Sequence, residues 1–453
     1  MGVRIAVNRF EKWLLTVFFI ELFIGGGGRL IDFGVLSIRQ VLFLLILCTF
    51  VFRILKNKQF LDRNVNTFFD FNITSVAIYM LVTWFGVSAL IGLIHGHALS
   101  TVAMDFFRVS FFLLYFPLAY YISEERYRKS KIISILKYSS LIVAVFTILI
   151  SLAGKTIFNN NFDVFYNFIN SIMNDDLFFR PSHSVFYKGH FFVLMGLLVS
   201  LNAVLSKQGS KVDVVNIIVC LISIIWSETR GFLLAIMFGI LFIVMMDVKT
   251  FTDQIKGLWK KAVHLLNSKF ILKKIVVSLL IVIAVPFMYK YMTIERFGTE
   301  TVSQQKPKAP AEKPEEPQVN DVSVNSRLEF ISASKDLVFK NVPAFVVGSG
   351  YGTEIAGRDS GIEMSFLDIL VEQGVIGLAL WLYVCFIIFY NYHLVYKAQG
   401  SVETTDISLL ACIAALVLLT NINPFINNPL GIGFILTVLV LSKNKRDALK
   451  RAV

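Results

Sequence analysis

The sequence predicts an all-α polytopic membrane protein of about twelve transmembrane helices, with one large, late extracytoplasmic loop that contains short helices. Two observations support this fold class. Hydrophobic residues make up 56% of the chain, and the apolar runs recur in blocks of about 17–25 residues, the length that crosses a bilayer as a helix. Basic residues also collect in alternate loops, which is the bias that orients membrane proteins.

The apolar runs divide the chain into three parts. Residues 1–292 hold the earlier spans, residues 293–363 form the extracytoplasmic loop, and residues 364–453 hold the last spans and a cytoplasmic tail. The first run is longer than a signal-peptide core, so we expect it to be retained as a helix. The expected spans are about 11–30, 35–55, 74–95, 102–122, 136–154, 184–206, 212–227, 231–247, 272–292, 365–396, 404–422 and 426–442.

The basic residues give this arrangement a direction. With a cytoplasmic N-terminus, every inner loop carries lysine or arginine, as the positive-inside rule requires. The net charge of +12 is therefore a sign of topology, and we expect no nucleic acid partner. Cations that lie on the outer side against this bias indicate an anionic partner there. Outside the long loop they are Arg29, Arg39, Arg108, Lys155, Arg180, Lys188 and Arg230.

The long loop begins with a Pro- and charge-rich stretch at residues 306–317, which is typical of an extended spacer. A helix is expected from Arg327, after the capping residues Asn325 and Ser326, and Pro343 is expected to end it. A glycine-rich turn over Gly348–Gly352 follows. Its backbone N–H groups suit a phosphate, and the alternative is a tight turn after a helix.

Arg230 and Arg180 are the first two candidates for contact with an anion. Arg230 lies in a polar hinge between two apolar runs, and its guanidinium has the shape to hold a phosphate or diphosphate. The alternative is a membrane-surface cap that pairs with Glu228. Arg180 stands at the entry to the span 184–206, and Lys188 and His190 follow it. A helix face that carries His183 and His190 would show both to the outer side; the alternative is a solvated helix start.

Three further residues belong to the candidate site. Arg327 opens the loop helix, where N–H groups and the helix dipole also favour an anion; a surface ion pair with Glu329 or Asp321 is the alternative. Arg108 is a candidate for substrate binding, or it simply pairs with Asp105 three residues earlier. Tyr351, in the glycine-rich turn, is a candidate for substrate binding.

Glu363 is the leading acidic candidate. It lies one turn before a strongly apolar run, where a general base could meet a sugar hydroxyl. The alternative is an acid that stabilises the helix start through the dipole. Glu354 and Asp359 lie nearby, but no spacing enforces a metal site. Cys48, Cys220, Cys385 and Cys412 fall within expected spans, so we expect neither a disulfide nor a metal there.

Three segments resemble the O-antigen ligase and O-antigen polymerase superfamily of multispan envelope glycosyltransferases. Ser227–Gly231 looks like the family's arginine turn, and Arg327–Gly352 looks like its loop helix and exit. Glu363-Met364, nine residues and Gly374-Val375-Ile376-Gly377 look like the ligases' His-Asn/Ser element with its Gly-x-x-Gly. Where the ligases carry His, this chain carries Glu363, which favours a polymerase. The resemblance spans roughly residues 180–380 and implies a GT-C-like fold.

The resemblance implies a bacterial inner-membrane enzyme that transfers a glycan from undecaprenyl diphosphate to a lipid-linked repeat unit, on the outer face and with inversion. Glu363, Arg230 and Arg327 would be catalytic, and Arg180, Lys188, His190, Arg108 and Tyr351 would bind the substrate. No cofactor or metal is expected; membrane lipid and a chain-length regulator are expected partners. The alternatives are an O-antigen ligase, a protein O-glycosyltransferase, or a lipid-linked glycan transporter, which the absence of repeat symmetry disfavours.

Overall fold

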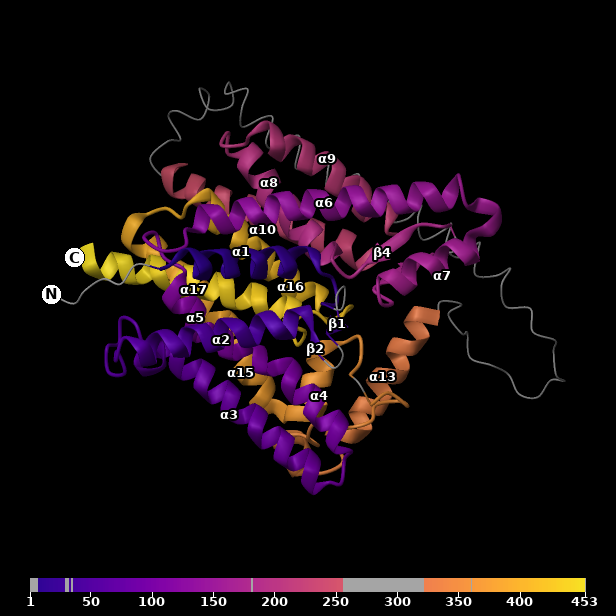
Figure 1. Cartoon of the computed structure of the whole chain (residues 1–453), viewed down its shortest axis with the longest axis horizontal. Coiled ribbons are helices and arrows are strands. Elements are labelled where there is room, and N and C mark those ends of the chain that lie inside the picture. Colours follow the sequence, from indigo (N-terminus) through magenta and orange to yellow (C-terminus); the bar gives the residue numbers. More distant parts are fainter. Residues whose placement is uncertain are drawn as a thin grey trace.

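The computed structural model describes residues 7–28, 32–33, 36–180, 182–255, 322–359 and 361–452. Most of these residues are helical, and the long helices lie side by side along one direction (Figure 1). Both chain ends lie at one end of this bundle, whereas α7 and α13 lie at the other. We call these the terminal end and the loop end of the molecule.

The first half of the chain forms α1 (Arg9–Ile24), α2 (Ile38–Lys56), α3 (Ile73–Ile94) and α4 (Leu99–Ser110), then α5 (Tyr115–Tyr121) and α6 (Lys129–Lys155). Three-residue turns of 3₁₀ helix lie at Thr67–Phe69 and Asn159–Asn161, and a four-residue one (Phe111–Leu114) joins α4 to α5. Capping explains where two of the helices begin. Asn8 and Glu11 cap α1 reciprocally, and Asn72 and Ser75 do the same for α3.

The middle of the chain differs from the expected pattern. Helix α7 (Phe162–Ile172) is followed by a hairpin of β3 (Leu177–Phe179) and β4 (Val185–Tyr187), in antiparallel register with Phe178 opposite Phe186. Helix α8 (His190–Leu205) therefore begins later than the expected span at 184. Then come α9 (Lys211–Trp226) and α10 (Arg230–Ile255). A second, shorter hairpin pairs β1 (Asp32–Phe33) with β2 (Leu36–Ser37).

The described part of the long loop forms α13 (Val322–Val338) and α14 (Val342–Val347). Two expectations about this loop are corrected. Arg327 lies in the second turn of α13 and does not open it, and Pro343 stands at the start of α14, which Asn341 caps. The chain then forms α15 (Ser365–Gln399), α16 (Thr404–Leu419) and α17 (Pro429–Ala452). The spacer at 306–317 lies outside the described residues.

Each expected span overlaps one or more described helices, except 272–292, which lies outside the described residues. Five helices are long and apolar enough to cross a membrane, namely Ile38–Lys56, Ile73–Ile94, Leu99–Tyr121, Lys129–Lys155 and Ser365–Gln399. Shorter apolar helices lie at His190–Leu205, Arg230–Met246 and Thr404–Leu419. The chain is thus an all-α protein with several apolar helices, and the full number of spans stays a prediction.

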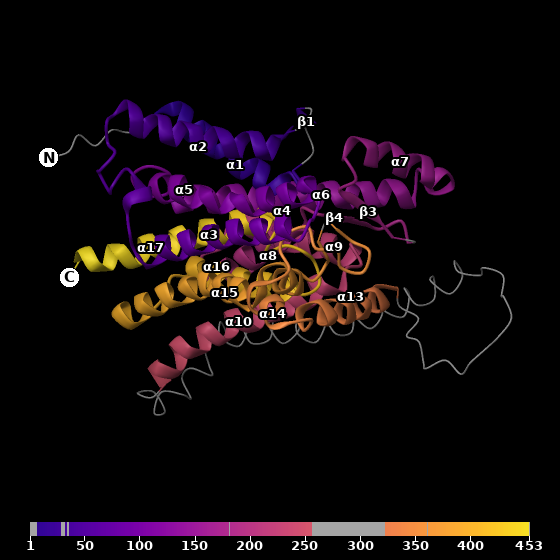
Figure 2. The ribbon, with the colours of Figure 1, turned by 90° about the horizontal axis from the view of Figure 1, so that it is seen from below.

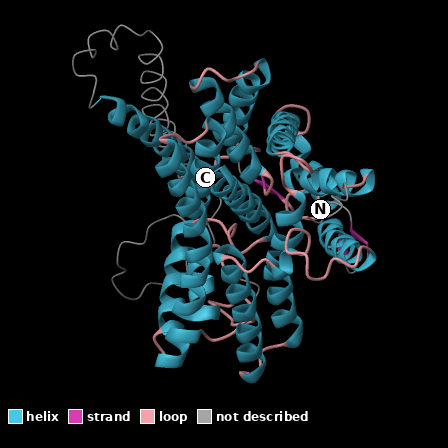
Figure 3. Ribbon diagram, turned by 90° about the vertical axis from the view of Figure 1, so that its left-hand side faces the viewer, coloured by secondary structure: helices cyan, strands magenta, loops and turns pink. Residues whose placement is uncertain are grey.

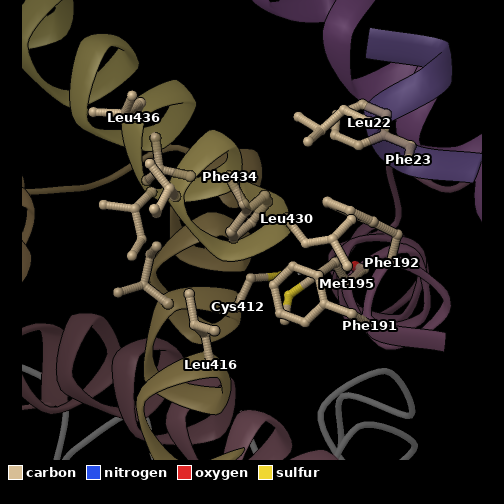
Figure 4. Close-up of a cluster of buried hydrophobic side chains, with 14 of the residues drawn as sticks. Leu22, Phe23, Phe191, Phe192, Met195, Cys412, Leu416, Leu430, Phe434 and Leu436 are labelled. Carbon is tan, nitrogen blue, oxygen red and sulfur yellow. Dashed lines mark hydrogen bonds between the residues drawn. The ribbon is translucent and has the colours of Figure 1, made fainter. Parts of the chain in front are cut away.

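The main core lies between α1, α8, α16 and α17. Phe191 and Phe192 of α8 point toward Phe434 of α17, and Leu22 and Phe23 of α1 lie above Phe192 in this view (Figure 4). Helices α1 and α2 lie on one flank of the bundle and α10 lies with α13 on the opposite flank (Figure 2). Seen from the terminal end, helices fill nearly the whole section and strands are short (Figure 3). The core that carries the loops at the loop end is therefore built almost wholly of helices.

Candidate active site

The turn between α16 and α17, residues 420–428, lies beside the start of α15. The backbone N–H of Ser365 donates to the carbonyl oxygen of Thr420 at 3.1 Å. This bond satisfies one of the N–H groups that a helix start leaves unpaired, and it fixes the start of α15 against the end of α16. Because Glu363 precedes Ser365 by two residues, the same contact brings Glu363 to the α16–α17 turn.

Arg327 and Glu363 meet at this turn. Their side chains form an ion pair at 3.7 Å, with exposed fractions of 28% and 43%. Arg327 Nη2 also donates to the carbonyl oxygen of Ile422 at 3.5 Å. Both side chains therefore remain accessible to a solute, and a partly exposed pair of this kind contributes only about 0–1 kcal/mol to stability.

Helix α13 holds Arg327 in place through the face that it buries. Phe330, Ser334 and Val338 are four residues apart and all buried, so they form one stripe on the helix. Phe330 and Val338 pack in a small core with Ile355 and with Val371 of α15. The loop is thereby fastened to the same helix that follows Glu363.

Arg230 lies at the start of α10, which packs against the same turn. It is the first residue of α10, after a link of only three residues from α9. A Cβ atom at Gly231 would lie 2.9 Å from the Ile422 side chain, tighter than ordinary contact, so glycine allows α10 to approach the α16–α17 turn this closely. This gives a structural reason for glycine after the arginine.

The β3–β4 hairpin places Arg180 beside Arg230. Arg180 Nη2 lies 3.5 Å from the hydroxyl of Thr229, and the backbone N–H of Arg180 donates to Ser184 at 2.9 Å. The hydroxyls of Ser182 and Ser184 both donate to the carboxylate of Glu228. These bonds tie the hairpin turn to the link between α9 and α10. The structure thus brings Arg180, Arg230, Arg327 and Glu363 together around the α16–α17 turn through shared neighbours.

Several buried polar atoms at this place have no hydrogen-bond partner among the described residues. They are Arg327 Nε, Ser365 Oγ, Thr420 Oγ1 and Asn423 Nδ2. Buried polar groups are nearly always paired, so an unpaired group calls for water or a ligand. Sequence reasoning missed the α16–α17 turn because Thr420 and Asn423 resemble ordinary turn residues. Four asparagines and a threonine within nine residues, between two apolar runs, were the available signal.

Arg108 belongs to a separate, buried cluster of charges beneath the site. Its guanidinium lies 3.1 Å from Asp105, 3.7 Å from Asp368 and 4.0 Å from Glu372. The expected alternative, a pair with Asp105, is confirmed, and Asp368 and Glu372 join that pair. Asp368 also accepts from Asn427 Nδ2 at 2.8 Å and from the N–H of Ile362 at 3.4 Å. It therefore connects the segment before Glu363 to the α16–α17 turn.

Tyr351 is fully buried against this same cluster, so the structure does not offer its ring to a substrate. Burial first, and then the nearby carboxylate of Glu372, raise the pKa of Tyr351 well above its usual value. The phenol keeps its proton, and among the described residues its hydroxyl has no hydrogen-bond partner.

The glycine-rich turn has a structural task. Helix α15 is kinked at Gly374, where φ is +65°, and the kink frees carbonyl groups one turn earlier. The N–H groups of Ser349 and Gly350 donate to the carbonyls of Val371 and Glu372 at 2.8 and 3.0 Å. Since these N–H groups are occupied, the turn does not cradle a phosphate here, and the alternative of a tight turn holds.

Two other outer cations and one histidine already have partners inside the protein. Lys188 pairs with the buried Asp176 at 2.6 Å, and Arg39 pairs with Glu21 at 2.9 Å. His190 is fully buried, with Nδ1 at the backbone of Tyr187 and Nε2 3.0 Å from Ser223 Oγ. The expectation that one helix face shows His183 and His190 to the outside is wrong, because His183 lies before the helix. Arg29 lies outside the described residues.

No group of three or more His, Cys, Asp or Glu side chains that could hold a metal occurs within the described ranges. A cavity of about 150 Å³ lies elsewhere, lined by residues that include Phe242, Tyr392 and Tyr396. Tyr392 and Tyr396 lie near the C-terminal end of α15, toward the terminal end of the bundle, and Phe242 lies midway along α10. The cavity is thus far from the arginines and carries no part of the site.

Comparison with known proteins matches the expected superfamily. The model of the O-antigen ligase family matches residues 215–382, a range that contains Arg230, Arg327 and Glu363. The chain is also 26% identical to an O-antigen polymerase of Shigella flexneri over 447 residues, which cover 96% of this chain and 95% of that protein. The resemblance inferred from the sequence is therefore confirmed, and it extends over almost the whole chain.

Proposed function

Because this chain resembles the O-antigen ligase and O-antigen polymerase superfamily over almost its whole length, we propose that it polymerises lipid-linked repeat units of a surface polysaccharide. The donor is a glycan on undecaprenyl diphosphate, and the acceptor is a second lipid-linked repeat unit. The reaction takes place on the outer face of the bacterial cytoplasmic membrane. The observation that carries this proposal is the gathering of Arg180, Arg230, Arg327 and Glu363 around the α16–α17 turn.

In the proposed reaction, a hydroxyl oxygen of the acceptor attacks the anomeric carbon of the donor from the side opposite the diphosphate. The bond between that carbon and the diphosphate oxygen breaks, and undecaprenyl diphosphate leaves with the electron pair. The hydroxyl proton passes to the carboxylate of Glu363, the role of a general base. Direct displacement of this kind inverts the anomeric centre.

The arginines stabilise the charge that builds up on the leaving diphosphate. A planar guanidinium holds two phosphate oxygens at once, and fixed positive groups that await a developing negative charge are among the largest contributions to catalysis. Arg327 serves a second purpose because its 3.7 Å contact with Glu363 orients the carboxylate. The unpaired polar atoms of Ser365, Thr420 and Asn423 support a polar ligand or water in the same place.

The test is incubation of the purified protein with lipid-linked repeat units, followed by separation of the glycans by size. We expect a ladder of products that differ by one repeat unit, together with release of undecaprenyl diphosphate. The match to the O-antigen ligase family favours a second candidate, in which the glycan is transferred to a different acceptor. A ladder in the absence of any other acceptor supports the polymerase. Transfer only after a lipid A-core or protein acceptor is added would exclude the polymerase.

A further inference from the structure

Helix α7 (Phe162–Ile172) has two distinct faces. The inner face packs on the β3–β4 hairpin: the rings of Phe162 and His183 stack at 3.8 Å between centroids, and Tyr166 meets Phe179 edge-on at 4.8 Å. Phe165, on the same face, is buried. These contacts pack α7 on the hairpin, including the strand that precedes Arg180.

The outer face of α7 leaves a row of apolar side chains uncovered. Val164, Phe168 and Ile172 are 72%, 62% and 55% exposed, and their spacing of four residues places them in one stripe. A parallel stripe of exposed polar residues, Asp163, Asn167 and Ser171, runs beside them. A helix with an uncovered apolar stripe next to a polar one is the pattern of a helix that lies in a membrane interface.

The stripe continues a surface that belongs to a spanning helix. Helix α6 is long and apolar enough to cross a membrane, and it exposes Ile142 and Leu149 along its length. Ile157, just beyond its end, is exposed as well. Helix α7 lies against this end of α6, at the loop end of the bundle (Figures 1 and 2). Exposed apolar residues thus follow one another from α6 through Ile157 to the α7 stripe at the loop end.

We propose that α7 lies in the outer leaflet of the membrane, with Val164, Phe168 and Ile172 among the lipid chains and Asn167 toward water. A second copy of this chain is a poor occupant, because a helix of eleven residues is only about 16 Å long. A stripe of that length falls well short of the roughly 800 Å² per partner that a stable protein interface buries.

The position of α7 in the membrane has a consequence for Arg180, and this consequence rests on the proposed function. Helix α7 packs on the hairpin through Phe179, and Arg180 is the next residue along the chain. The depth of α7 in the membrane therefore sets the depth of Arg180. A helix that is anchored at the level of the lipid headgroups holds Arg180 where the diphosphate of a lipid-linked donor lies. The membrane contact itself does not depend on that function.

Spin labels can locate α7 in the intact protein. Phe168→Cys and Asn167→Cys are made with Cys48 replaced by alanine, since the other cysteines are buried, and each variant is labelled with a nitroxide in nanodiscs of phosphatidylethanolamine and phosphatidylglycerol. At position 168 we expect a shift of accessibility toward oxygen, which dissolves in lipid, and away from a water-soluble nickel complex. The matched label at position 167 should show the reverse, and Val164→Cys should repeat the result at 168.

The outcomes separate the possible occupants. Nickel accessibility at 168 equal to that at 167 would place the stripe in water and overturn the proposal. Shielding of the label from both reagents would also overturn the proposal. Spin–spin broadening would then indicate that a second copy covers the stripe. Its absence would indicate that another segment of the same chain covers it. If the stripe lies in lipid, Phe168→Glu should cause a loss of polymer, whereas Asn167→Glu should not. Lipid accessibility with normal polymer formation in Phe168→Glu would leave the membrane contact standing and refute its role in placing Arg180.

Discussion

At the residue scale, Glu363 is the side chain whose replacement is most informative. Glu363→Gln keeps the shape and the hydrogen-bonding groups but removes the basicity, so polymer formation should fall by about 10²–10⁴, the usual loss for a positioned general base. Expression, insertion and donor binding should stay normal. Glu329→Gln is the matched control, because Glu329 is exposed in the same loop.

Wild-type polymerisation by Glu363→Gln would leave Glu363 only as the surface partner of Arg327. The base would then be sought at Glu354, Asp359 or His183. His190 is not a substitute, because both of its ring nitrogens are engaged inside the bundle.

The arginines are tested by substitutions that keep the charge. Arg180→Lys, Arg230→Lys and Arg327→Lys each retain a cation but lose the planar fork that holds two phosphate oxygens. We expect each to lower the rate of polymerisation by about tenfold or more, equivalent to about 1.4 kcal/mol or more of transition-state stabilisation. Arg128→Lys, in an exposed position before α6, is the control. Full activity in all three variants would rule out bidentate contacts to the diphosphate.

At the element scale, Asp368 joins the buried cluster around Arg108 to two parts of the site. It contacts Arg108 of α4, Asn427 of the α16–α17 turn and the N–H of Ile362 beside Glu363. Asp368→Asn removes the charge while keeping the size, and charge-assisted hydrogen bonds contribute about 1.5–3 kcal/mol each. We therefore expect a lower kcat at nearly unchanged KM for the lipid-linked donor, because the base is less well positioned.

The control for Asp368→Asn is Asp406→Asn. Asp406 is equally buried and paired with a cation, Lys129 at 3.0 Å, but it lies at the start of α16 in the terminal end of the bundle. Both variants should lose thermal stability, whereas only Asp368→Asn should lose kcat. An equal loss of kcat in the two would mean that Asp368 matters for stability alone.

The kink of α15 depends on Gly374. Its backbone, at φ +65° and ψ −173°, is one that residues with a side chain adopt only at a cost of about 1–3 kcal/mol. A Cβ atom there would also overlap the carbonyl oxygen of Val346. Gly374→Ala should therefore lower the midpoint of thermal unfolding in detergent. Gly86→Ala, in α3 with open space around it, should leave the midpoint unchanged or raise it, and equal midpoints in the two variants would count against the kink as a strained position.

The sequence predicts the helices well because an apolar run of span length leaves a strong signal. The β3–β4 hairpin was missed because its strands have three residues each, too few for an alternating pattern to appear. The buried cluster was missed because Asp368 and Glu372 sit inside an apolar run. Charged residues inside an expected span are themselves a functional signal, and their spacing of four, facing Asp105 and Arg108 at a spacing of three, was the clue that sequence reasoning passed over.

The site residues show the same limit. Arg180, Arg230 and Arg327 were singled out because the sequence was expected to place each at an outer helix boundary, although only Arg230 begins a helix. That Ile422 lies between them, and that Lys188 is occupied by Asp176, follows from long-range packing that no local pattern carries. Pairing of a cation is decided by neighbours that are distant in sequence.

At the scale of the whole molecule, the arrangement of the ends makes a prediction about topology. Both termini lie at one end of the bundle, and α7, α13 and the candidate site lie at the other (Figure 1). The terminal end also carries lysines expected on the inside, including Lys129, which pairs with Glu403, and Lys445, which pairs with the same carboxylate. Since inner loops carry the excess of positive charge, the terminal end should be cytoplasmic and the site extracytoplasmic.

Cysteine labelling in intact cells checks this orientation. Gln208→Cys, in the link between α8 and α9, and Ser171→Cys, on the polar stripe of α7, are both exposed, and Cys48 is replaced by alanine in each. A membrane-impermeant maleimide should label position 171 in intact spheroplasts and position 208 only after the membrane is opened. The reverse pattern would invert the topology, and the arginines would then face a compartment in which the glycan-bearing lipid of an extracytoplasmic polymerase is not presented.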